Sequence, residues 1–262
     1  LSVSGNGSVG TGDVAINAGT LQLSGTGSVE MGDVYVAGGG TLRFSRSGTT
    51  YFDAAISGSG AINQTSGTVV VRGDNDAYGG TITLSNWSAT LQVGDGGTAG
   101  TLGAGTVGGY GNLVFNRSDG LVSPRAITGS VAVTIAAGSS LTVAGDSANG
   151  LPDGQTGTGA VTVDGILDLN GHTVTVGRLL GNGTVTSSAA GSVFRVGNNS
   201  GAAYTFAGVI EDGLGTLALT KLGAGTLTLS GANAYSGGTT VEAGTLSVSG
   251  NGSVGTGDVA IN

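Results

Sequence analysis

The sequence contains no cysteine, and it has only two prolines, one histidine and one tryptophan in 262 residues. Because no disulfide framework can form, the stability of the fold must come from repetition of structure. No run of about twenty apolar residues is present, so we expect no membrane-spanning helix. The chain also lacks the basic and apolar regions of a signal peptide, and we expect any export signal to lie outside this sequence.

Charge is also scarce, since only 9% of the residues are charged. The net charge is −8, and the eight basic residues are spread singly without interleaved aromatic residues, which argues against nucleic-acid binding. A disordered chain typically has few apolar residues and a high net charge, so the low share of charged residues argues against disorder. Because 38% of the residues are hydrophobic, we expect a folded protein.

Glycine, in contrast, is abundant, with 56 residues that do not follow the Gly-X-Y period of collagen. Between the glycines lie short runs that alternate apolar and polar residues, such as Thr226–Leu229 and Thr245–Val248. Alternation with period two places Leu227 and Leu229 on one face of a strand. The sequence therefore predicts short strands joined by glycine-rich corners.

Short phrases return at intervals of about 20 residues. Residues 225–231 reappear in modified form as residues 244–250, and residues 1–16 reappear, also in modified form, as residues 21–36. Each period offers three apolar sites, which predicts an all-β fold, a single right-handed parallel β-helix (β-solenoid) with three short strands per turn. Residues 1–262 should form one continuous solenoid in which Leu1, Leu21 and Leu42 stack in a column.

A longer repeat encloses the shorter one. Residues 1–17 recur without change as residues 246–262, which indicates a 245-residue period of a longer tandem array. Residues 144–160 form the longest stretch without the alternating pattern, and we expect them to form a projecting loop.

The phrase Gly-Ala-Gly-Thr-Leu-Thr-Leu-Ser-Gly-Ala-Asn-Ala-Tyr-Ser-Gly-Gly-Thr-Thr-Val-Glu-Ala-Gly-Thr-Leu at residues 223–246 closely resembles the passenger-associated repeat of bacterial autotransporters. A weaker copy extends over residues 55–93 and contains Asp76-Ala-Tyr-Gly-Gly-Thr. The resemblance implies a pertactin-like β-helical passenger, exposed on the outer-membrane surface of a Gram-negative bacterium or released as an extracellular fibre. Such a passenger crosses the outer membrane unfolded, which agrees with the lack of cysteine.

Residues that carry chemistry are few, and most of them have a structural interpretation. Most aspartates lie in or beside glycine-rich turns, where a carboxylate hydrogen-bonds its own backbone. His172 lies at a corner without a second histidine, and Asp74-Asn-Asp76 lacks the spacing of a calcium loop. We therefore expect no catalytic, cofactor-binding or metal-binding residues.

Two further features are of kinds that occur in binding sites, a receptor-recognition tripeptide and aromatic residues. Arg72-Gly73-Asp74 is an integrin-recognition tripeptide at a predicted corner, although it can equally be a variant of the corner at residues 230–232. Trp87 and the tyrosines are interpreted as packing or corner residues rather than as a platform for sugars.

The sequence thus predicts a non-catalytic stalk or fibre unit of an extracellular bacterial surface protein, which assembles end to end or by covalent tandem repeats into a filament. The first alternative is an adhesin with a loop that binds a specific host receptor, such as an integrin, or surface glycans. The second alternative is a carbohydrate-active β-helix enzyme. No nucleic-acid partner and no embedding in the membrane are expected.

Overall fold

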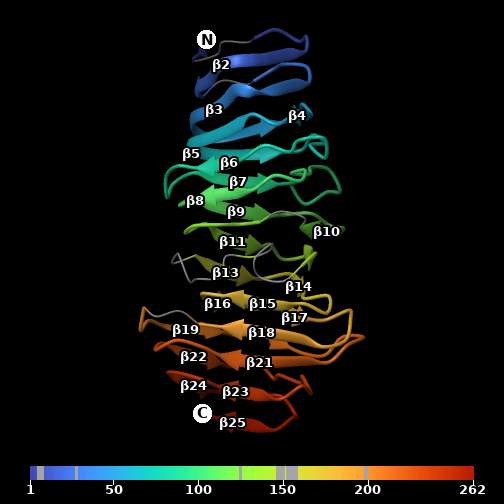
Figure 1. Cartoon of the computed structure of the whole chain (residues 1–262), viewed down its shortest axis with the longest axis vertical. Coiled ribbons are helices and arrows are strands. Elements are labelled where there is room, and N and C mark those ends of the chain that lie inside the picture. The colour runs from blue at the N-terminus through green and yellow to red at the C-terminus, as the bar shows by residue number, and fades with distance from the viewer. Residues whose placement is uncertain (5–8, 27–28, 124–125, 146–150, 152–158, 198–199) are drawn as a thin grey trace. The chain divides into compact units, whose positions relative to one another are not determined.

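The computed structural model describes residues 1–4, 9–26, 29–123, 126–145, 151, 159–197 and 200–262, and every regular element in them is a β-strand. All strand pairs given for these residues are parallel, and strands that follow one another by about one turn lie side by side (Figure 1). The all-β parallel β-solenoid is therefore confirmed. The described residues contain no helix with the length and apolar character needed to cross a membrane.

The chain forms two compact units. The first contains Leu1–Arg117 and residues 126–127, and the second contains residues 118–123 and Thr128–Asn262. The prediction that residues 1–262 form one continuous solenoid stays a prediction.

The first unit is built on one long parallel sheet and a shorter row of strands beside it. The sheet has the order β1 (Ser2–Val3), β2 (Val14–Gly25), β3 (Val34–Phe52), β5 (Ala61–Val71), β7 (Thr90–Val93) and β9 (Asn112–Phe115). The shorter strands are β4 (Ile56–Gly58), β6 (Ile82–Leu84) and β8 (Val107–Gly109). Strand β3 pairs with β4 through its first residues and with β5 through its later residues, so a single strand supplies two positions of the turn.

The second unit has the expected three strands per turn, which fall into separate rows. One row contains β11 (Ala132–Ile135), β13 (Ala160–Val163) and β16 (Arg178–Leu180). The next contains β10 (Gly120–Ser123), β12 (Ser140–Val143), β14 (Ile166–Asp168), β17 (Thr184–Thr186) and β20 (Val209–Ile210). The third row contains β15 (Thr173–Val176), β18 (Ser192–Val196), β21 (Leu217–Lys221), β23 (Thr239–Val241) and β25 (Val259–Ile261). The first row continues with β19 (Ala203–Phe206), β22 (Thr226–Leu229) and β24 (Thr245–Val248), because Gly181, directly after β16, forms a parallel bridge with Phe206.

The core consists of columns of inward-facing apolar side chains. Leu21 is in register with Leu42, and Leu42 with Ile62, which gives spacings of 42 − 21 = 21 and 62 − 42 = 20 residues. All three side chains are at most 5% exposed. Leu1 precedes Ser2, the residue paired with Gln22, but it is 83% exposed, so the buried part of this column begins at Leu21.

Residues 144–160 lie largely outside the described residues. Leu151 is buried with 1% exposure, and Ala160 is already the first residue of β13. The prediction of a projecting loop stays a prediction.

Candidate interaction surfaces and internal clamps

Arg72 lies at a corner of the first unit, between two aspartates of neighbouring turns. Its Nε and Nη2 atoms donate to the two carboxylate oxygens of Asp53 at 2.6 and 2.8 Å, and its Nη1 donates to Asp95 at 3.2 Å. The guanidinium also lies 4.6 Å from the centre of the Tyr51 ring. The hydrogen bonds from Arg72 to Asp53 and Asp95 raise the pKa of Arg72 above its ordinary value. The guanidinium is therefore already engaged by groups of this chain.

The rest of the tripeptide is part of the same corner. Gly73 is buried, and a side chain there would collide with the carbonyl oxygen of Ala54 in the preceding turn. The exposed Asp74 accepts a hydrogen bond from the backbone of Asp76 at 3.0 Å. An integrin would have to replace these contacts in order to bind Arg72 and Asp74, and the role of the tripeptide in receptor binding stays a prediction.

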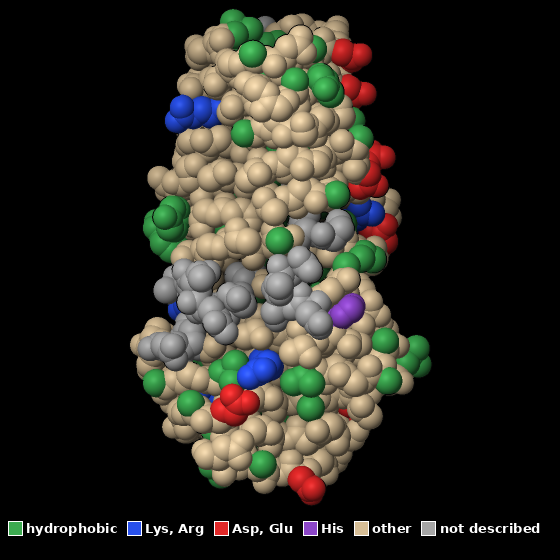
Figure 2. All heavy atoms as spheres, viewed as in Figure 1, with side chains coloured by type: hydrophobic (Ala, Val, Ile, Leu, Met, Phe, Trp, Pro, Cys, Tyr) green, Lys and Arg blue, Asp and Glu red, His purple; other side chains and the backbone are tan. Residues whose placement is uncertain are grey.

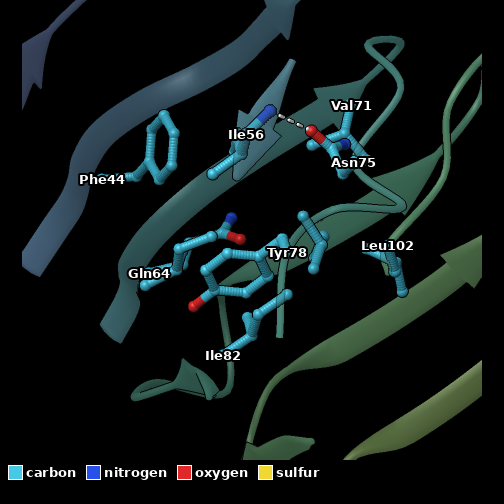
Figure 3. Close-up of a pocket in the computed structure, with 10 residues that line it drawn as sticks. Phe44, Ile56, Gln64, Val71, Asn75, Tyr78, Ile82 and Leu102 are labelled. Atoms are coloured by element: carbon cyan, nitrogen blue, oxygen red, sulfur yellow. Dashed lines mark hydrogen bonds between the residues drawn. The ribbon is translucent and has the colours of Figure 1, made fainter. Parts of the chain in front are cut away.

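Next to this corner, the side chain of Asn75 joins three successive turns. The residue is 3% exposed, and its Oδ1 accepts from the backbone N–H of Ile56 at 2.7 Å (Figure 3). Its Nδ2 donates to the carbonyl oxygens of Thr101 at 2.7 Å and Gly73 at 3.2 Å. Because backbone groups at corners cannot all join strand ladders, a buried amide that satisfies three of them stabilises the corner. We call this arrangement an amide clamp.

The second unit contains a matching clamp at the corresponding place in the stronger repeat. Asn233 accepts from the backbone N–H of Ile210 at 2.8 Å and donates to the carbonyl oxygens of Gly231 at 2.9 Å and Ser253 at 2.6 Å. A buried tyrosine follows each clamp, and the Tyr235 hydroxyl lies 2.6 Å from Thr239 Oγ1. Both copies of the passenger-associated repeat therefore contain an asparagine that joins neighbouring turns. The resemblance in sequence did not reveal this contact.

Lys221 also joins neighbouring turns, like the two amide clamps, but through a buried ammonium group. We use the name internal clamps for these three residues, Asn75, Asn233 and Lys221. Lys221 has no exposed surface, and Nζ donates to the carbonyl oxygens of Leu222 at 2.6 Å, Gly223 at 2.9 Å and Ala243 at 3.2 Å. Burial lowers the pKa of Lys221. Three carbonyl dipoles, one of them from the following turn, replace the water around this charge.

The interior of the first unit contains a small cavity of about 20 Å³ between Phe44, Gln64, Tyr78 and Leu102 (Figure 3). Gln64 is 1% exposed, and its Nε2 donates to the carbonyl oxygens of Gly67 and Thr90, whereas its buried Oε1 accepts no hydrogen bond. The space is about that of one water molecule and is far smaller than a sugar ring.

The aspartates support the corners, but Asp13 and Asp33 accept from the backbone of the following turn rather than from their own backbone as the sequence suggested. Asp13 and Asp33 each accept a backbone N–H from the following turn at 3.0 Å, and Asp212 accepts from Leu217 and Ser236. Burial alone would raise the pKa of Asp212, but the hydrogen bonds from Ser236 and Leu217 hold it below its ordinary value. In the part of the chain that the structure describes, no group of three or more acidic, histidine or cysteine residues could hold a metal ion.

Acidic side chains are nevertheless visible along one edge of the first unit on the face shown in Figure 2.

His172 takes part in a corner through its backbone, since its N–H donates to the Leu169 carbonyl and its carbonyl accepts from Val193. This corner position agrees with the prediction for His172.

Aromatic side chains divide into a buried and an exposed group. Tyr78, Tyr204 and Tyr235 are at most 6% exposed and belong to the core. Burial raises the pKa of Tyr204 to about 12. Trp87 and Tyr110 lie at corners and are 62% and 54% exposed, with ring centroids 5.6 Å apart and planes inclined by 46°. The sequence led us to interpret Trp87 and the tyrosines as packing or corner residues, and it did not indicate that Trp87 and Tyr110 form a pair.

Comparison with known proteins supports the resemblance. Residues 219–248 match the model of the passenger-associated-transport-repeat family. The adhesin BmaC autotransporter of Brucella suis biovar 1 (strain 1330) is 32% identical over 299 residues, which cover 91% of this chain and 8% of that protein. The chain thus spans a small fraction of the length of this relative. No solved structure matches the chain.

Proposed function

Because the chain is an autotransporter passenger β-helix with a passenger-associated transport repeat, we propose that it is a stalk unit of a bacterial surface protein. In this proposal the unit is extracellular, non-catalytic and repeated in tandem, so that successive copies form one filament. The proposal rests on two segments of identical sequence, residues 1–17 and residues 246–262. Each of them pairs with a different neighbouring turn.

The first copy of the segment pairs with the turn that follows it. Val14 is in register with Val34, and the Val14 N–H donates to the Asp33 carbonyl oxygen at 2.8 Å. A hollow of about 420 Å³ lies on this copy and is lined by residues that include Leu1, Val9 and Ile16. The pairing of Val14 with Val34 is the contact of this segment with the turn that follows it, and the hollow is the face on which we propose that a preceding turn packs.

The second copy pairs with the turn that precedes it. Val259 is in register with Thr239, and the Asp258 carbonyl oxygen accepts from the Thr239 N–H at 2.8 Å. Asp258 and Val259 are the counterparts of Asp13 and Val14 (258 − 13 = 245 and 259 − 14 = 245). One copy thus uses the N–H of the Asp-Val pair towards its successor, and the other copy uses the C=O towards its predecessor.

The two pairings use different backbone groups, so one segment can make both at once. That is the condition of an internal turn in a solenoid, where each turn contacts only its two neighbours. The side chains agree, since Ile16 is 6% exposed beneath its successor, whereas its counterpart Ile261 is 80% exposed. We therefore propose that residues equivalent to 18–45 follow residues 246–262 and bury Ile261 as Ile16 is buried.

Tandem linkage fits these observations better than stacking of separate chains. In an array with a 245-residue period, one copy of the 17-residue segment is shared by two units. If separate chains were stacked, two identical segments would lie in succession, and the groove on residues 1–17 would meet Leu246 and Ile261 instead of the turn that contains Thr239. Only tandem linkage reproduces pairings that the structure already contains.

An adhesive role is the second candidate, because the relative is named an adhesin. In that case a receptor would bind corner residues such as Arg72 and Asp74, and the stalk would present them. Loss of cell adhesion after Asp74→Ala, without loss of stability, would favour this function.

The stalk proposal can be tested by hydrogen exchange in two chains. The first is residues 1–262, and the second is the same chain followed directly by another copy of residues 18–262. We expect amide exchange in residues 246–262 to become slower in the longer chain, because the following turn covers their open edge. Exchange in Val34–Phe52 is the internal control. Equal exchange rates of residues 246–262 in both chains would refute the proposal.

A further inference from the structure

The exposed pair of Trp87 and Tyr110 is unusual in this chain. Trp87 is its one tryptophan, and the two residues come from neighbouring turns of the first unit. With the planes inclined by 46° at a separation of 5.6 Å, the rings do not cover one another, and more than half of each side chain remains accessible. Large apolar groups that solvent can reach in this way mark interaction sites when they are held in place.

The backbone is held in place at both residues. On one side, the Asn112 Nδ2 donates to the carbonyl oxygen of Trp87 at 3.0 Å. On the other side, Tyr110 lies between Gly109, whose φ is +112°, and Gly111. A side chain at Gly109 would collide with the carbonyl oxygen of Leu84, so this corner requires glycine to bring Tyr110 next to Trp87. Because the backbone is held at both positions, binding there orders mainly the two side chains.

The two segments that carry the rings, residues 77–94 and 96–116, contain no Asp, Glu, Lys, Arg or His. Asp95, which lies between these segments, is paired with Arg72, whose Nη1 donates to it at 3.2 Å. Small hydroxyl and amide groups flank the tryptophan: Ser85 donates to Asn63 at 2.6 Å, and Ser88 donates to Asn86 at 3.0 Å. A charged ligand would find no opposite charge in these segments, whereas a neutral ligand with many hydroxyl groups would find hydrogen-bonding partners.

The exposure and pairing of these two rings depart from the sequence interpretation of Trp87 and the tyrosines as packing or corner residues. From this geometry we propose that Trp87 and Tyr110 form a platform that binds a neutral hexopyranose ring of a polysaccharide. The C–H face of the sugar packs on the indole and phenol rings, and its hydroxyl groups bond to Ser85, Asn86 and Ser88. Trp and Tyr suit this role because each combines a broad apolar face with a polar atom. The platform does not depend on the stalk proposal, since it uses residues of the first unit alone.

The experiment uses the fluorescence of Trp87, which reports this site directly because no other tryptophan contributes. The full chain is titrated with cellohexaose, chitohexaose, maltohexaose, mannohexaose and laminarihexaose. We expect a saturable change in emission with at least one sugar, and binding roughly tenfold weaker in Tyr110→Ala. Tyr35→Ala removes a 49% exposed tyrosine from another turn and should bind like the wild type.

Three results would overturn the proposal. The first is unchanged emission with every sugar, and the second is equal binding by wild type and Tyr110→Ala. The third is a change in emission that follows protein concentration without sugar, because the rings would then contact another protein surface. Gel retardation by the polysaccharide that contains the bound sugar should be lost in Trp87→Ala, and retained folding of each variant is checked by far-ultraviolet circular dichroism.

Discussion

The amide clamp at Asn233 gives the sharpest prediction about stability. Asn233→Ala removes one hydrogen bond from the Ile210 N–H and two to carbonyl oxygens, at a residue that is only 5% exposed. Each such bond contributes about 1 kcal/mol, and the Ile210 N–H would be left buried without a partner. We expect the free energy of unfolding to fall by about 3 kcal/mol, which corresponds to a decrease of about 1 M in the urea midpoint at a slope of about 3 kcal/mol/M.

Circular dichroism during urea titration measures this change. Asn182→Ala, at an exposed site of the same unit, is the matched control and should shift the midpoint by less than about 0.3 M. Asn75→Ala should reproduce the effect of Asn233→Ala in the first unit, because Asn75 makes the corresponding three bonds. If Asn233→Ala behaves like Asn182→Ala, the clamp does not stabilise the turns and the reasoning is wrong.

Two other predictions concern the core and acid stability. Leu21→Asp should lower the free energy of unfolding by several kcal/mol, because the carboxylate would be buried against Leu42. Thr20→Asp, on the exposed face, should leave it nearly unchanged. Equal urea midpoints for the two variants would contradict the column of stacked apolar side chains. The folded pKa of Asp212 is lowered, so its stabilisation is complete above the unfolded pKa of about 4 and is lost as pH falls through the lower folded value. As the pH falls from about 4 through the folded pKa of Asp212, the melting temperature of Asp212→Asn should therefore decrease less than that of the wild type. Thermal unfolding at a series of pH values measures this difference. Identical decreases would show that the hydrogen bonds from Ser236 do not act on this carboxylate.

The sequence predicted the repeating part of the fold well, because a solenoid turns a local pattern into a global one. Leu21 and Leu42 recur at nearly one turn, and the structure places them side by side. The same alternation could not show that β3 runs on for 19 residues. Its glycines at residues 38–40 resemble a break between strands, although in the structure they lie within the strand and its pairing continues at Gly39 and Gly40.

The internal clamps could not be predicted in the same way, since their partners are distant in sequence. Lys221 is the last residue of strand β21 and would ordinarily be assigned to the surface, but Ala243 of the next turn provides one of its three acceptors. For Asn233, alignment of the two copies of the repeat was the available signal, because Asn75 occupies the matching corner. The pairing of Trp87 with Tyr110 required the position of the corners in space, which spacing alone does not provide.

The central claim is that this unit continues in tandem, and electron microscopy of the native cell-surface assembly tests it most directly. A period of 245 residues with about 20 residues per turn corresponds to about 12 turns. Because each turn rises about 4.8 Å, we predict an axial repeat of about 60 Å along an unbranched filament. Images that show this repeat, with continuous density through the position of residues 246–262, would agree with the account. Filaments without an axial repeat near this length, or isolated particles of a single unit, would contradict it.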